Sequence, residues 1–171
     1  MGAAPPRGVT LTHETRAWLA ALEARPPRHA RILRALVDAG ERDDRVRTVM
    51  VGCSIGRGVA DELSDIDAHV MVADDAWPAV VDDVERVANA AGEPMEVIVH
   101  RLDGVSRDTH RHVFVQYSDG VQLSLVVQPL AAQTRRGRAA DVVVLHDPDD
   151  HLGVVVEPSS SRLSPRRCCD G

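Results

Sequence analysis

The chain of 171 residues contains no lysine: its twenty basic positions other than histidine are all arginine. Chemistry that needs a lysine amine is therefore excluded, including the Walker A phosphate-binding loop and the Tyr-x-x-x-Lys catalytic pair. The single tyrosine, Tyr117, agrees with this, because Val121 stands four positions after it. The arginine excess is typical of a GC-rich genome and by itself indicates no function.

Long apolar runs, cysteines and excess positive charge are also scarce or absent. No apolar run approaches the roughly eighteen residues that predict a membrane span, and the first ten residues lack the apolar segment of a secretory signal. The three cysteines, Cys53, Cys168 and Cys169, are an odd set that predicts no disulfide framework, so a reducing cytoplasm is the expected location. The net charge of −6 predicts no basic face, which makes nucleic acid a poor candidate for a partner.

The length suits one domain with a real core. Residues 1–9 are expected to form a flexible tail, residues 10–156 the domain, and residues 157–171 a disordered tail without periodicity. Apolar stripes predict helices that carry Leu11–Leu22, Ile32–Val37 and Trp77–Ala91, the last capped by Asp74 or Asp75. Shorter helical pieces are expected near 58–63 and 130–138.

β-branched and alternating runs predict the strands. These are expected at 46–53, 65–72, 95–102 and 141–148, with a hairpin whose arms, 112–117 and 121–129, flank an Asp-Gly signal. The middle helix can supply a parallel crossover, whereas the hairpin makes part of the sheet antiparallel. The order of elements therefore predicts an α/β (α+β) fold, with a short mixed β-sheet and helices packed mainly on one face.

The segment GCSIGRGVADELSDID, residues 52–67, joins a glycine-rich turn to an Asp-x-Asp. The glycines follow the spacing G-x-x-x-G-x-G, which differs from the G-x-G-x-x-G of dinucleotide-binding turns. This spacing also occurs in short-chain dehydrogenases, but the missing Tyr-x-x-x-Lys pair excludes them. The glycines alone therefore indicate only that the backbone can approach a ligand closely.

The Asp-x-Asp narrows the chemistry. On a strand Asp65 and Asp67 point to the same face, with Cα atoms about 6.5 Å apart. Two such carboxylates beside a phosphate-binding turn can hold divalent cations next to a triphosphate, and Mg²⁺ prefers a few carboxylates together with phosphate oxygens and water. Ser54 and the amides around Gly56 and Gly58 are expected to bind the terminal phosphates.

The segment VGCSIGRGVADELSDIDAHV resembles the signature of the DNA polymerase beta-type nucleotidyltransferase superfamily. It is most similar to the bacterial branch of aminoglycoside, lincosamide and minimal nucleotidyltransferases, over roughly residues 28–150. The resemblance implies the nucleotidyltransferase fold, an NTP substrate, expected to be ATP, and a two-metal Mg²⁺ site. It assigns metal binding to Asp65 and Asp67, and nucleotide binding to Gly52, Cys53, Ser54 and Arg57. Gly58 is added to the nucleotide-binding residues as part of the glycine turn.

One position departs from the family pattern. The family has a third carboxylate on a later strand, in a run like DG-x-x-LDL, and this chain has DGVQLSLVVQP with Ser124 at that position. The resemblance therefore predicts a catalytic set of Asp65, Asp67 and Ser124. A serine cannot act as a base at neutral pH. Glu96 is a candidate replacement if its strand lies beside the 121–127 strand.

Two functions follow from this pattern. The first is Mg²⁺-dependent transfer of a nucleoside monophosphate from an NTP to a hydroxyl of a small molecule or protein. The second is a catalytically degenerate domain that binds a nucleotide or a partner, for example as an antitoxin, and a homodimer is conceivable in either case. The intact Asp-x-Asp favours the first function and Ser124 favours the second.

Histidines occur near the predicted site. His69 shares a strand face with Asp67, where it can contact the nucleotide or orient a metal-bound water. His110 and His112 also share a face and can ligate a metal. The alternative for the second pair is a solvated strand face before the hairpin, which is the commoner situation.

Overall fold

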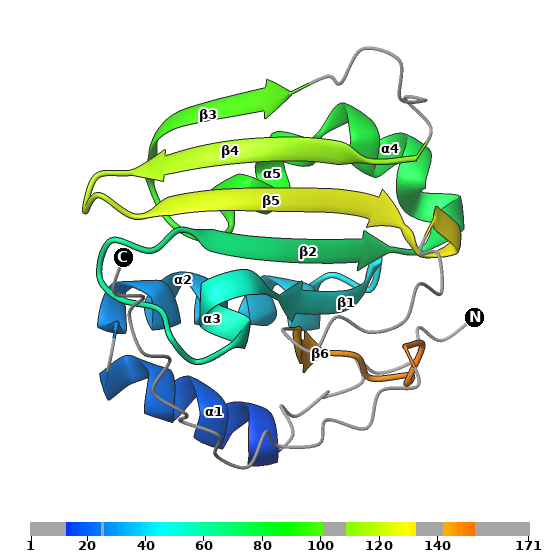
Figure 1. Ribbon diagram of the computed structural model, residues 1–171. Helices are drawn as coiled ribbons and strands as arrows, with labels where there is room; N and C mark the ends of the chain where they lie inside the picture. Colours follow the sequence, from blue (N-terminus) through cyan, green and yellow to red (C-terminus); the bar gives the residue numbers. More distant parts are fainter. Residues whose placement is uncertain (1–12, 25, 101–108, 133–141, 153–171) are drawn as a thin grey trace, which may run out of the picture.

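A six-stranded mixed sheet organises the protein, seen in a computed structural model that describes residues 13–24, 26–100, 109–132 and 142–152 (Figure 1). In chain order the elements are α1 (His13–Ala24), α2 (Pro27–Arg42), β1 (Val46–Val51), α3 (Cys53–Gly56), β2 (Ile66–Val72), the 3₁₀ turn η1 (Asp74–Ala76), α4 (Trp77–Asp82), α5 (Val84–Asn89), β3 (Pro94–His100), β4 (Arg111–Tyr117), β5 (Gln122–Pro129), the 3₁₀ turn η2 (Leu130–Ala132) and β6 (Val143–His146). Within these ranges no helix combines the length and apolarity needed to cross a bilayer.

The strand order is β3-β4-β5-β2-β1-β6. β2 and β5 are parallel, and the other neighbouring pairs are antiparallel. β3 consequently runs in the same direction as β2, and the chain reaches it through α4 and α5, as a crossover connection requires. The predicted mixed α/β architecture is thereby confirmed, including the crossover through the middle helical region.

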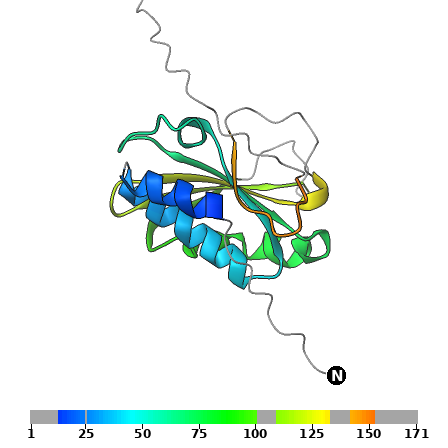
Figure 2. The same cartoon turned by 90° about the horizontal axis from the view of Figure 1, so that it is seen from below.

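The core lies on one side of the sheet. Figure 2 shows α1, α2, α4 and α5 all below the sheet, and the segment from α3 to β2 on the other side. The apolar stripe of α2, which includes Ile32, Leu33 and Leu36, is buried against the strands. Along β5 the side chains alternate, with Leu123 and Leu125 buried and Ser124 between them only partly covered. The strands therefore present one apolar face to the helices and one largely polar face, called here the open face.

Two predictions of helices were wrong. The helix expected near 58–63 is instead α3, which follows β1 directly and ends before Gly58, whose φ of +70° is not helical. The single helix expected over Trp77–Ala91 is divided at Asp83, where φ is −126°. Helix propensity is low for Asp82, Asp83 and the valines around them. Interrupting the helix here therefore costs little free energy.

The predicted cap of that helix was also wrong. Asp74 lies in η1 and its Oδ1 accepts a hydrogen bond from the Ala131 N–H at 2.8 Å, while no side chain caps α4. Most of the helical stretch expected near 130–138, both expected tails and the Cys168–Cys169 pair lie outside the described residues.

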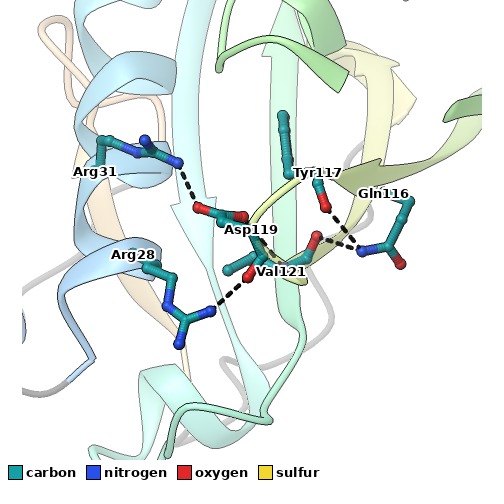
Figure 3. A network of polar contacts seen from close by, with 6 residues as sticks. All are labelled: Arg28, Arg31, Gln116, Tyr117, Asp119 and Val121. Carbon is teal, nitrogen blue, oxygen red and sulfur yellow. Dashed lines mark hydrogen bonds and ion pairs between the residues drawn. The ribbon is translucent and has the colours of Figure 1, made fainter. Parts of the chain in front are cut away.

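Polar contacts join α2 to the turn between β4 and β5 (Figure 3). The Asp119 carboxylate pairs with Arg31, and its backbone carbonyl accepts a hydrogen bond from Arg28. Within the hairpin, the Gln116 side-chain amide donates to the carbonyls of Tyr117 and Val121, both at 3.2 Å. Exposed ion pairs contribute about 0–1 kcal/mol each, so these contacts mainly orient the hairpin that carries Ser124.

The division into a buried and an open face predicts unequal effects of two truncations. Leu125→Ala, at a fully buried position of β5, should lower the free energy of unfolding by about 2–5 kcal/mol. Phe114→Ala, on the open face of β4 with 42% of its surface exposed, should lower it by about 1 kcal/mol or less. Urea unfolding measures both, and equal losses would mean that the open face is part of the core.

Candidate functional site

Strand register gathers the predicted site residues on the open face. Asp67 on β2 lies directly beside Ser124 on β5, which in turn lies opposite Phe114 on β4 and, one strand further, Ile98 on β3. In-register neighbours in a sheet point to the same face. The structure therefore places Ser124 next to Asp67, on the face that the helices leave uncovered.

The glycine turn lies at one end of the row of neighbouring side chains that runs from Asp67 through Ser124 and Phe114 to Ile98. The Gly52 N–H donates to the Asp67 carbonyl at 2.9 Å, which fixes the turn to the Asp-x-Asp strand. The amides of Gly56 and Gly58, which were expected to bind the terminal phosphates, donate instead to the carbonyls of Gly52 and Ile55. The N–H groups of residues 53–55 open α3, where N–H groups have no partner within the helix. Any backbone contacts to phosphate would thus come from residues 53–55.

The side-chain hydroxyl of Ser54 is buried without a hydrogen bond to any described residue. Its Oγ is shielded from solvent and has no hydrogen-bond partner among the described residues. Buried hydroxyls are normally paired, so an unpaired one needs an explanation, such as a bound water or ligand. Arg57 follows α3 with its side chain exposed, close enough to Cys53 to act on it electrostatically. The turn therefore offers a hydroxyl and a guanidinium near the two aspartates.

Cys53 is held in an unusual backbone conformation. Its φ is +54°, in the left-handed region that non-glycine residues seldom occupy. Its thiol hydrogen-bonds to the Asp67 carboxylate, and this bond, then burial, then the negative charge of Asp67 raise the pKa of the Cys53 thiol. The charge of Arg57 opposes the rise. Cys53 is thus a neutral hydrogen-bond donor to the second aspartate.

Asp65 stands just before β2, at the end of a short loop with its own hydrogen bonds. Asp61 Oδ1 accepts hydrogen bonds from the Leu63 N–H and the Ser64 hydroxyl, at 3.0 and 2.9 Å. From α2 the buried His29 donates through Nε2 to the Ser64 carbonyl at 2.6 Å. This contact ties the residue before Asp65 to the helical layer.

Sequence reasoning did not identify His29 as part of this support. The available signal was its position in α2, three and four residues before the buried Ile32 and Leu33, which puts it on the apolar face of that helix. A histidine there is expected to need a polar partner. Which partner it finds depends on the tertiary packing.

An open pocket of about 260 Å³ adjoins Asp65 on the open face, and Asp67 is not part of its lining. Its lining includes Asp65 and Ser124 at one side, and Glu96, Ile98 and Phe114 toward the sheet edge. Glu96 was considered as a replacement for the missing carboxylate if β3 lay beside β5. That condition is not met, because β4 lies between them. Glu96 instead lines the far side of the pocket.

Two histidines border the same row. His112 on β4 reaches diagonally to β5, where its Nε2 and the Ser124 Oγ lie 2.7 Å apart in a hydrogen bond. His69 follows Asp67 on the same face of β2, and burial lowers its pKa, opposed by the charge of Asp67. In the described part of the chain, no group of three or more His, Cys, Asp or Glu side chains is arranged to hold a metal. His110 and His112 are therefore part of no such group among the described residues.

The arrangement combines three chemical features within one strip of the open face. The turn offers N–H groups and a hydroxyl suited to anions, the Asp-x-Asp offers two hard oxygen ligands, and the pocket beyond Ser124 can accept a second molecule. Such a strip can hold a phosphorylated ligand at one end and a reacting group at the other.

No protein-family model and no curated protein sequence matches this chain. Solved structures that are similar in part include the following two. An aminoglycoside 6-adenyltransferase from Bacillus subtilis aligns at 16% identity over 60% of this chain and 35% of its own, with a TM-score of 0.43. The terminal uridylyl transferase 4 from Trypanosoma brucei with bound GTP aligns at 17% identity over 66% and 35%, with a TM-score of 0.37.

This chain therefore spans about a third of the length of either solved structure. At these identities and TM-scores, the function of the chain has to be inferred from its own site.

The contact between Cys53 and Asp67 predicts a change in thiol reactivity. Asp67→Asn removes the negative charge and weakens the hydrogen bond that together raise the thiol pKa, so the pKa should fall and alkylation by iodoacetamide at pH 8 should accelerate. Mass spectrometry of the peptide that contains Cys53 separates it from the two other cysteines. Asp65→Asn should have a smaller effect, because Asp65 acts only weakly on the thiol. Equal acceleration by both variants would contradict the contact.

Proposed function

We propose that this chain is a Mg²⁺-dependent nucleotidyltransferase, which transfers a nucleoside monophosphate from an NTP to a hydroxyl group of a small molecule or a protein. The observation that carries the proposal is the register of β2 with β5. It aligns Asp67 with Ser124, and the hydrogen bond from Gly52 holds the glycine turn at the end of the same row.

The donor set fits Mg²⁺ bound together with a triphosphate. Asp65 and Asp67 provide carboxylate oxygens, the ligands that this cation prefers, and neither side chain is buried. Within the described ranges Asp65 and Asp67 belong to no group of three ligand side chains. A cation held by these two residues would take its remaining ligands from phosphate and water. When bound, the cation neutralises charge on the triphosphate and on the leaving pyrophosphate.

The residues of the chain have separate roles in this proposal. The N–H groups that open α3 and the unpaired Ser54 hydroxyl bind phosphate oxygens, and Arg57 adds a positive charge beside them. Asp65 and Asp67 hold the cation. The acceptor enters the pocket lined by Ser124 and Phe114, on the side of Asp67 away from the turn. ATP is the proposed nucleotide.

A catalytically inactive binding domain is the second candidate. The observation that favours it is the serine at position 124, because β5 brings a hydroxyl beside Asp67 where a third carboxylate is expected. Pyrophosphate release from MgATP separates the two functions. If the wild-type chain binds MgATP, the Asp67→Asn variant does not, and the wild-type chain releases no pyrophosphate, then the chain is a binding domain.

The proposed cation site predicts that nucleotide binding depends on Asp67. Asp67→Asn should abolish the Mg²⁺-dependent part of ATP binding with little loss of stability, because the side chain is only partly buried on the open face. Asp75→Asn, at an exposed position beyond the other end of β2, is the matched control and should bind normally. Calorimetric titration with ATP, with and without Mg²⁺, measures the effect. Unchanged Mg²⁺-dependent affinity in Asp67→Asn would rule out the proposed site.

The glycine turn gives a second prediction. Gly52 is buried with an extended φ of −126°, which any residue can adopt, so a valine there acts through its volume. Gly52→Val should weaken MgATP binding at least tenfold, about 1.4 kcal/mol. Gly120→Asn changes a glycine in the β4–β5 turn with open space around it and serves as the control. Circular dichroism identifies the folded variants, and a folded Gly52→Val with normal affinity would contradict close approach of phosphate.

A further inference from the structure

The side chain that occupies the third-carboxylate position is not isolated. Ser124 lies beside Asp67, and from the other side the His112 Nε2 approaches its Oγ to 2.7 Å. His112 belongs to β4, and the register of the hairpin opposes it to Val126, two positions further along β5. The contact is therefore a diagonal one across adjacent strands, made on the open face next to the pocket.

We infer that Ser124 and His112 together form a proton relay that takes the place of the missing carboxylate. This inference rests on the proposed function. Ser124 contacts the acceptor hydroxyl, and His112 accepts the proton that Ser124 passes on. A histidine within hydrogen-bond distance of a serine is the arrangement by which a serine hydroxyl gains and loses protons at neutral pH.

The step balances without any further reactant. The acceptor oxygen forms a bond to the α-phosphorus of the NTP, and the bond from that phosphorus to the bridging oxygen breaks, releasing pyrophosphate. As the acceptor oxygen attacks, its proton moves to the Ser124 Oγ, and the Ser124 proton moves to the His112 Nε2. Water then removes the proton from His112, which is only partly buried.

The surroundings of His112 suit this role. Its ring lies 4.2 Å from the Phe114 ring, centroid to centroid, which limits rotation of the imidazole. Burial lowers the pKa of His112, the nearby His100 and His110 lower it further, and the charge of Asp67 opposes them. The neutral imidazole that results has one nitrogen free to accept a proton. The relay requires that nitrogen to be Nε2.

The first test reads the tautomer and needs no turnover. In a uniformly ¹⁵N-labelled chain at pH 8, long-range ¹H–¹⁵N correlation spectra should show the His112 Nδ1 protonated and Nε2 unprotonated. Ser124→Ala should move the Nε2 resonance of His112, whereas the ring of His100, which does not bond to Ser124, should change little. A proton on Nε2 in the free chain would overturn the relay, because His112 would then donate to Ser124.

The second test is a double-mutant cycle on pyrophosphate release from MgATP, with water as the acceptor. His112→Gln should lower kcat by roughly 10²-fold, at the lower end of what acid–base catalysis contributes, and leave MgATP affinity unchanged. Ser124→Asp supplies a carboxylate in place of the relay. In the Ser124→Asp background, His112→Gln should lower kcat by less than about threefold. The difference from the roughly 10²-fold loss in the wild-type background would show that the two positions are strongly coupled. His151→Gln, at a histidine that follows β6 at the opposite edge of the sheet from β3, is the control and should change neither background.

The outcomes separate this inference from the proposed function. Equal loss on His112→Gln in both backgrounds overturns the relay alone. Release of no pyrophosphate by a wild-type chain that binds MgATP overturns both the relay and the transferase function, and favours the binding domain. A mass increase of one AMP on Ser124 overturns the relay, because the serine would then be the nucleophile itself. Absence of Asp67-dependent MgATP binding overturns the proposed function, and the relay with it.

Discussion

The parallel pairing of β2 with β5 is the contact on which the remaining arrangement depends. These strands form the middle of the sheet, with β4 and β3 on one side and β1 and β6 on the other. Because successive side chains point to opposite faces, a slip of one residue would exchange the buried and open faces of a strand. Burial of Leu123 and Leu125 against the helices sets the register, and the same register puts Ser124 beside Asp67.

Covering only one face of the sheet has a chemical result. The helices bury the apolar side chains on one face of the central strands. The other face can therefore carry polar groups that would be costly to bury. Aspartates, histidines and glutamines occupy that side in rows defined by strand pairing. Supporting contacts come through the ends of the strands, from His29 to the loop before Asp65 and from Arg31 to the hairpin turn. The helical layer thus positions the site without contributing side chains to its open surface.

The sequence was sufficient for the strands, the one-sided core and the location of Asp65, Asp67 and Ser124, because each depends on local alternation and on one motif. Three contacts could not be predicted: His112 with Ser124, Cys53 with Asp67, and His29 with Ser64. Each joins residues whose distance depends on strand register or on how a helix packs, which no local pattern encodes. The division of the predicted helix at Asp83 has a similar cause. Helix propensity is low at this position, so tertiary packing decides whether the helix continues.

The β2–β5 pairing also has a consequence for the time course of folding. During synthesis the glycine turn and both aspartates emerge well before β4 and β5, so β2 waits with one edge unpaired. Its sequence, IDAHVMV, is largely apolar, and an exposed apolar edge in a partly made chain is prone to associate with other chains. Non-local parallel pairing is among the slower events in folding. The interval before β5 pairs is thus when a newly made chain is most vulnerable to aggregation, and when the two halves of its site are still apart.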